Sequence, residues 1–140
     1  MTLTPEHPTL AVEVGLTAAI VAAPDDAPVI LVAPGPAGAE PALPSGPFDP
    51  LAHRTFEIGL RAWVARQTGA PLGYVEQLYT FGDRGRHAEA GDSTPHVVSV
   101  GYLALTRGAD AALAKGAAFR SWYAFFPWED WRSGKPVMIE

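Results

Sequence analysis

The stretch HRTFEIGLRAWVARQTGA, residues 53–70, decides the fold, because it predicts the long helix against which the other elements must pack. Its apolar residues recur at intervals of three and four, which places them on one side of a helix: Phe56, Leu60, Trp63 and Val64. Gly69 follows as a C-terminal stop, because glycine readily adopts the left-handed conformation in which helices end. We therefore expect a helix over residues 51–68.

Two apolar runs and a proline-rich connection precede this helix. Residues 11–22 and 29–33 are rich in Val, Ile, Leu and Ala without helical periodicity, and Pro24-Asp25-Asp26 separates them, so they predict a hairpin. Residues 34–50 are crowded with Pro, Gly and Ala. Since proline lacks a backbone N–H, this composition disfavours both helix and sheet and predicts a connecting loop.

The second half of the chain predicts two more strands. Residues 74–81 and 97–105 are β-branched and aromatic runs on either side of a polar segment, so we expect strands around an exposed loop. The alanines of residues 109–115 favour a small helix. The tail that follows is rich in Phe, Tyr and Trp, which are typical of core or dimer interface and, alternatively, of an adenine platform. This order predicts a mixed α/β fold.

Composition limits the partners and the compartment. The 140 residues fit one domain, residues 1–140, with a flexible N-terminus over residues 1–9, and 48% hydrophobic residues are enough for a core. A net charge of −5 opposes nonspecific attraction to nucleic acid. The chain has no cysteine, which suits a reducing cytoplasm. Its apolar start is interrupted by Pro24-Asp25-Asp26, so we expect no membrane span.

Residues 53–70 also resemble a Nudix box, whose glutamates hold a divalent cation against a diphosphate. When Gly69 is aligned with the last glycine of that box, Arg54 stands at the first glutamate position. Trp63 stands at the glutamate of the Arg-Glu pair, and Arg66-Gln67 stand at the Glu-Glu pair. Every carboxylate position is lost, and arginine cannot coordinate a cation. We therefore expect no metal, no cofactor and no catalysis.

The sequence after the helix resembles a narrower group. Residues 73–86 (GYVEQLYTFGDRGR) and 97–105 (VVSVGYLAL) are similar to the ADP-ribose branch of the Nudix family, and within it to regulators of NAD metabolism of the NrtR and NadQ kinds. Residues 53–55 and the ending FPWEDWR, residues 126–132, look most like the NadQ type. The resemblance implies a Nudix-fold α/β/α sandwich with a mixed sheet. It also implies a homodimeric effector-binding domain for ADP-ribose, NAD or a similar nucleotide, coupled in full-length regulators to a DNA-binding segment.

Residues 79–86 offer what a nucleotide diphosphate needs. Tyr79 and Phe81 are flat apolar surfaces, Arg84 and Arg86 carry positive charge, and glycines between them let backbone approach a ligand. The alternative is that the two aromatic residues are core strand residues and that the two arginines are solvated loop charges.

Three further residues are candidates for ligand contact. Arg54 and Arg66 would put fixed positive charge where an enzyme puts its cation, so that a diphosphate binds without hydrolysis. The alternative is a solvent-facing row of ion pairs, in which Arg54 shares a helix face with Arg61 and Glu57 pairs with either. Glu76 would bond ribose hydroxyls if it faces the cleft, and would otherwise tie helix to strand.

Two rival functions remain open on the sequence. One is a working ADP-ribose pyrophosphatase that recruits other acids as metal ligands: Glu57, Glu76, Asp83 or Glu89. The other is a purely structural dimerisation module, which would be favoured if Trp63 and its neighbours fill the cleft.

Overall fold

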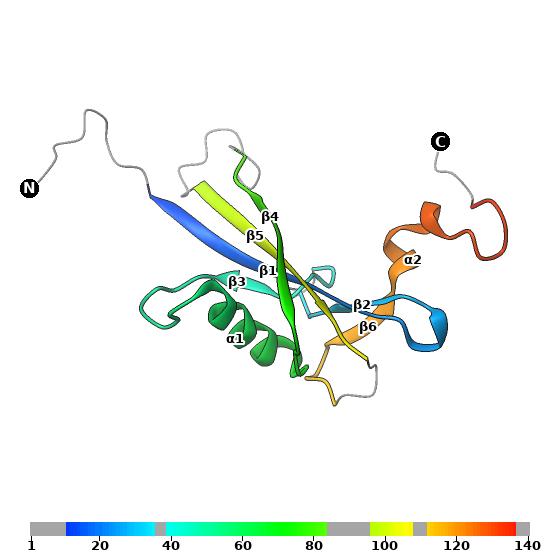
Figure 1. Cartoon of the computed structure of the whole chain (residues 1–140), viewed down its shortest axis with the longest axis horizontal. Helices are drawn as coiled ribbons and strands as arrows, with labels where there is room; N and C mark the ends of the chain where they lie inside the picture. Colours follow the sequence, from blue (N-terminus) through cyan, green and yellow to red (C-terminus); the bar gives the residue numbers. More distant parts are fainter. Residues whose placement is uncertain (1–10, 36–38, 84–95, 108–111, 137–140) are drawn as a thin grey trace, which may run out of the picture.

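A six-stranded mixed sheet forms the centre of the protein (Figure 1). The computed structural model describes residues 11–35, 39–83, 96–107 and 112–136. The strands are β1 (Val12–Ala22), β2 (Val29–Val32), β3 (Ser45–Pro47), β4 (Val75–Phe81), β5 (His96–Leu105) and β6 (Ala118–Ser121). Their order is β4-β5-β1-β2-β6, and β3 pairs with β1 outside this path. Only β1 and β5 run parallel among these pairs, which makes the sheet mixed.

The predicted hairpin is confirmed, and the predicted loop is partly wrong. β1 and β2 pair antiparallel with Val21 opposite Ile30. Within residues 34–50, however, β3 forms, and Ala42 bridges Ala33. The prolines are tolerated there because a proline carbonyl still accepts: Pro44 O takes a hydrogen bond from Ala18 N at 3.0 Å.

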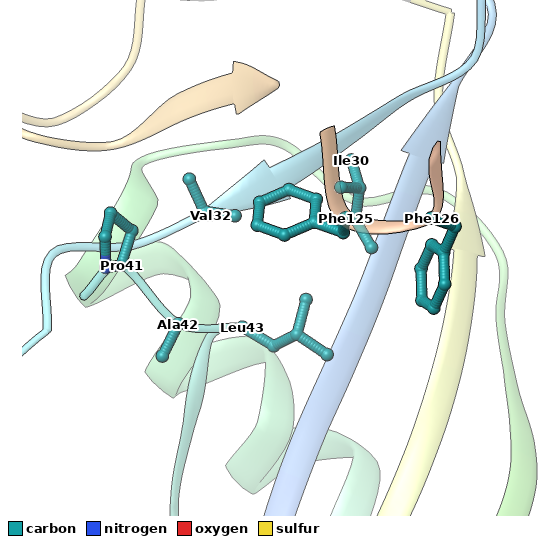
Figure 2. A pocket seen from close by; sticks show the side chains of 7 residues that line it. All are labelled: Ile30, Val32, Pro41, Ala42, Leu43, Phe125 and Phe126. Atoms are coloured by element: carbon teal, nitrogen blue, oxygen red, sulfur yellow. The ribbon is translucent and has the colours of Figure 1, made fainter. Parts of the chain in front are cut away.

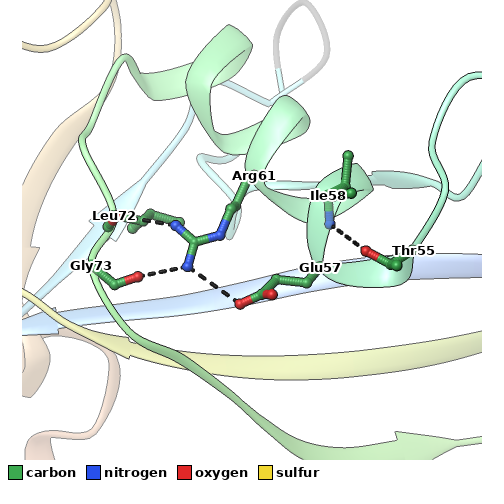
Figure 3. Close-up of polar contacts among 6 residues, drawn as sticks. All are labelled: Thr55, Glu57, Ile58, Arg61, Leu72 and Gly73. Atoms are coloured by element: carbon green, nitrogen blue, oxygen red, sulfur yellow. Dashed lines mark hydrogen bonds and ion pairs between the residues drawn. The ribbon is translucent and has the colours of Figure 1, made fainter.

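The long helix, α1 (Phe56–Thr68), is confirmed, but it begins later than residue 51. Thr55 caps it, since its hydroxyl accepts a hydrogen bond from Ile58 N at 3.1 Å (Figure 3). Gly69 ends the helix with a φ of 69°. Arg54 therefore precedes the helix, and the expectation that it shares a helix face with Arg61 is wrong.

One face of the sheet forms the core against α1. Alternate residues of β1 and β5 are buried there together with Leu60 and Val64 of α1: Leu16, Ala18, Ile20, Val100, Tyr102 and Ala104. The intervening residues point to the opposite side, which we call the open face: Thr17, Ala19, Val21, Ser99, Gly101, Leu103 and Leu105. These side chains are half-buried or exposed.

The aromatic tail borders the open face. It folds into two short pieces, α2 (Trp122–Phe125) and the 3₁₀ turn η2 (Pro127–Glu129), and α2 begins beside the start of β2, where Trp122 N donates to Pro28 O (Figure 1). Phe119 packs against the core, whereas the side chain of Trp131 is 62% exposed. The core role expected of the tail thus holds only in part.

The small helix expected over residues 109–115 is wrong for residues 112–115: residues 112–114 have no regular secondary structure and residue 115 begins a turn. Residues 109–111 lie outside the described residues. The backbone instead continues into β6, where Phe119 finds core contacts. The predicted flexible N-terminus also lies outside the described residues. In the part of the chain that the structure describes, no helix has the length and apolarity to cross a membrane.

Candidate functional site

Side chains from α1 close the free edge of β3. Trp63 Nε1 donates to Pro47 O at 2.9 Å. The Gln67 amide accepts from Ser45 N at 3.0 Å and donates to Ser45 O at 2.7 Å. Among the strands that the structure describes, β3 pairs with β1 alone, so these backbone groups would otherwise have no partner in the sheet. Two of the positions that match glutamates in the aligned box therefore form a brace between α1 and β3.

The indole of Trp63 also packs against the backbone of β3. A Cβ placed on Gly46 would lie 2.2 Å from Trp63 Cε2, so only glycine fits at this point of the strand. The Arg66 guanidinium lies 5.0 Å from the centre of the Trp63 ring, at the distance of a cation–π contact. Arg66 is thus held at the same edge of the sheet as the brace.

The residues present do not fit a divalent cation. The aligned carboxylate positions carry an indole and an amide bonded to β3, together with two guanidinium groups. Nowhere in the described ranges do three His, Asp or Glu side chains come together in a group that could hold a metal. Glu89, one of the proposed substitute ligands, lies outside those ranges.

Glu57, another proposed substitute ligand, is used in a structural contact (Figure 3). It pairs with Arg61 at 3.3 Å. Arg61 also donates to Leu72 O at 3.0 Å and to Gly73 O at 2.6 Å. These bonds connect α1 to the segment that leads into β4. The carboxylate of Glu57 therefore helps to hold Arg61 in the position from which it joins helix and strand.

A hollow of roughly 300 Å³ opens on the open face. Small residues of the two central strands form much of its lining: Thr17, Ala19, Ser99 and Gly101. The larger residues around it are Leu43, Leu78 and Phe81, and Tyr102 lines it from within β5 while its ring points to the core. A cleft lined mostly by apolar groups, with a few polar ones, is the usual form of a small-molecule site. We therefore take this hollow as the candidate site.

A β-bulge turns the aromatic residues of β4 to the open face, where Phe81 lines the hollow. The register with β5 shifts between Gln77 and Tyr79, and Tyr79 then lies opposite Gly101 and Phe81 opposite Ser99, on the open face. The rings of Tyr79 and Phe81 meet edge to face at 4.9 Å. The side chain of Tyr79 is 64% exposed, so the alternative that it is a core residue is wrong.

The structure divides the predicted site residues into two groups. Glu76, Tyr79 and Phe81 belong to the open face, since Glu76 lies opposite Leu103. Arg66 lies on the α1 side of β3, and Ser45 of β3 pairs with Thr17, which lines the hollow. Since α1 covers the buried face of the sheet, Arg66 and the open-face group lie on opposite sides of the sheet, with β3 at the edge nearest Arg66. Arg84 and Arg86 lie outside the described residues.

Arg54 stands apart from both groups. It is exposed in the turn before α1, and within the described ranges its side chain makes no hydrogen bond or ion pair, so the predicted row of ion pairs reduces to Glu57 and Arg61. Sequence reasoning also missed Leu43 and Leu78. The available signal was the run of small residues at alternate positions of β1 and β5, which leaves a depression on one face of a sheet.

The phenol of Tyr102 stays neutral at physiological pH. Burial raises its pKa above the usual value of 10.0, and the negative charge of Glu57 adds to the rise. The side chain of Tyr102 belongs to the buried face of β5, so its phenol lies on the α1 side of the sheet, opposite the hollow.

A glutamate at position 67, where the aligned Nudix box has one, should destabilise the fold. In Gln67→Glu, the carboxylate can still accept from Ser45 N, but it has no hydrogen to give Ser45 O, which lies 2.7 Å away. We expect the free energy of unfolding in urea at pH 7 to fall by about 1 kcal/mol. Gln67→Met, which loses both bonds but adds no charge, is the matched control and should fall by at least as much. An unchanged Gln67→Glu would show that the brace contributes nothing.

The comparisons with known proteins identify the fold. No family model and no curated protein matches the sequence. Among solved structures, the NUDIX domain of Shewanella oneidensis NrtR complexed with ADP ribose is similar with a TM-score of 0.70 and 20% identity, over 84% of this chain and 78% of that one. A MutT/nudix family protein from Enterococcus faecalis gives a TM-score of 0.66 and 20% identity, over 86% and 47%.

The complex of Shewanella oneidensis NrtR with a 27mer DNA gives a TM-score of 0.58 and 21% identity, over 77% of this chain and 50% of that one. The present chain thus spans about half the length of the Enterococcus protein and of this NrtR chain. At these identities the likeness shows the fold. The chain has the Nudix fold, in its α/β form with a mixed sheet, as the sequence predicts.

Proposed function

We propose that this Nudix-fold chain binds ADP-ribose, NAD or a close relative without hydrolysing it. In this proposal it is a single domain of 140 residues that senses the nucleotide for a cytoplasmic, homodimeric regulator of NAD metabolism. Ligand would favour one arrangement of the dimer over another, and a DNA-binding part of the regulator would respond to that difference.

The brace between α1 and β3 is the observation that carries the proposal. Trp63 and Gln67 hold backbone groups at positions where the aligned box has metal ligands. Arg66 stands beside them on the Trp63 ring. A guanidinium group can hold a phosphate with two hydrogen bonds, but it cannot lower the pKa of a bound water as a metal ion does. Binding is thereby separated from hydrolysis.

Different residues in and around the hollow would contact different parts of the ligand. In the proposal, Tyr79 and Phe81 stack against a flat ring, and Glu76 accepts hydrogen bonds from ribose hydroxyls. The diphosphate crosses the edge at β3 toward Arg66. Arg84 and Arg86 add positive charge to the same anion. The NrtR domain with bound ADP ribose supports this ligand class by its shared fold.

Titration calorimetry with ADP-ribose, with Mg²⁺ and then with EDTA, tests the proposal. We expect the same affinity in both buffers and no AMP by chromatography after prolonged incubation. Arg66→Met should weaken binding by about tenfold, because a charged hydrogen bond contributes roughly 1.5 kcal/mol. Arg120→Met, at an exposed arginine of β6, is the control and should bind normally. AMP release that requires Mg²⁺ would instead establish a pyrophosphatase.

A structural dimerisation module is the second candidate, and the packing of Trp63 against Gly46 favours it. The hollow on the open face favours the nucleotide sensor over the structural module, because a purely structural role requires no ligand cavity. Failure of ADP-ribose, NAD and nicotinamide mononucleotide to bind at millimolar concentration would support the module and refute the sensor.

A further inference from the structure

A second apolar cavity, which we call the slot, lies on the open face next to the hollow (Figure 2). It measures about 240 Å³ and is lined by Ile30, Val32, Pro41, Ala42, Leu43, Phe125 and Phe126. In Figure 2 the ring of Phe125 lies along Val32 and Ile30, and residues 41–43 line the opposite side. Leu43 lines both cavities, so the slot and the hollow share a wall.

The walls of the slot are held in place by contacts outside it. Ala42 exchanges two backbone hydrogen bonds with Ala33, at 2.8 and 3.1 Å. The next fixed point is Pro44, which is fully buried. On the other side, the ring of Phe126 lies 4.7 Å from that of Trp122 and 5.6 Å from that of Trp128. Walls fixed in this way do not collapse, so the space is available to a ligand.

The lining determines what the slot can take. All seven side chains are apolar, so a charged group inside would lose its hydration without gaining a partner. An apolar cavity of about 150 Å³ can take up benzene, and this slot is larger. Phe125, whose side chain is 41% exposed, provides a face on which a flat ring can stack. An uncharged flat ring satisfies all three conditions.

We propose that the slot binds a second, uncharged ring of a dinucleotide whose remainder occupies the hollow. This inference rests on the proposed function and specifies its ligand. The hollow and the aromatic pair on β4 accommodate the first ring. The second ring reaches the slot past Leu43, which lines both cavities. A ligand with two rings uses both cavities, whereas ADP-ribose, with a single base, fills one of them.

Three ligands that share the ADP-ribose body separate these possibilities. ADP-ribose has no second ring, NADH adds an uncharged dihydronicotinamide, and NAD⁺ adds a positively charged pyridinium. We expect NADH to bind about tenfold more tightly than ADP-ribose, since stacking of a base on an aromatic residue contributes roughly 1 to 3 kcal/mol. NAD⁺ should lie between them, because the apolar lining disfavours its charge. Equal affinity for NADH and ADP-ribose would overturn the proposal.

Variants of Phe125 locate the effect. Phe125→Ala should lower NADH affinity to that of ADP-ribose and leave ADP-ribose binding unchanged, and Phe125→Tyr, which keeps the ring, should restore the preference. Trp131→Ala removes an exposed aromatic residue of the same tail that does not line the slot, so it should change neither ligand. A parallel loss for both ligands in Phe125→Ala would refute the second-ring assignment. Absence of binding by every nucleotide in the wild-type chain would instead refute the proposed function.

Discussion

Gly46→Ala is expected to destabilise the protein by about 3 kcal/mol, a large share of the stability of a domain of this size. The new methyl group would lie 2.2 to 2.6 Å from three atoms of the Trp63 indole, so the ring or the strand must move. Either movement breaks the bond from Trp63 Nε1 to Pro47 O. Calorimetric melting should show a loss of roughly 10 °C.

A double variant separates this clash from any backbone preference of glycine. Gly46→Ala combined with Trp63→Ala removes the obstructing ring, so the second substitution should add little to the loss caused by Trp63→Ala alone. Full additivity of the two losses would contradict the close packing of Gly46 against Trp63. A change at Gly73, where an added Cβ meets nothing within 4 Å, serves as the control and should be small.

Ala19→Phe is expected to abolish ADP-ribose binding, with a loss of affinity above about 100-fold, because the phenyl ring would occupy the hollow. Ala19 lies on the open face of β1, and an aromatic residue is well tolerated in a strand. The melting temperature should therefore change little while calorimetric titration loses its signal.

The matched control is Ala65→Phe, which adds the same ring at an exposed position of α1. It should bind ADP-ribose with wild-type affinity. If Ala19→Phe binds as well as the wild type, the hollow is not the ligand site. If Ala65→Phe loses binding to the same extent, the effect of Ala19→Phe is not specific to the hollow.

The elements with strong periodicity could be predicted from the sequence. The apolar spacing of α1 and its glycine stop fix a helix, and the β-branched runs fix the strands β1, β2, β4 and β5. The start of α1 was misplaced because Thr55 competes for the first turn as a cap. β3 was missed because its sequence, Ser-Gly-Pro, has no strand propensity, and its stability comes from tertiary bonds to β1 and α1.

The candidate site was harder to predict than the fold. The sequence indicates that Tyr79 and Phe81 are suited to a ligand, but only the register shift in β4 brings both to one face. The loss of carboxylates from α1 is visible in the sequence, whereas the bonds that Trp63 and Gln67 make to β3 depend on packing. The slot is lined by residues from three separate segments of the chain, so no local sequence pattern predicts it.

The parallel pairing of β1 with β5 has a consequence for biosynthesis. Val12 lies beside His96 and Val21 beside Leu105. β1 is therefore synthesised early in translation, but its pairing cannot be completed until β5 has been synthesised. Until then its partners are β2, β3 and α1, and such incompletely paired nascent intermediates are prone to aggregate. We expect the central pairing to limit the rate of folding and chaperones to raise the yield of folded protein.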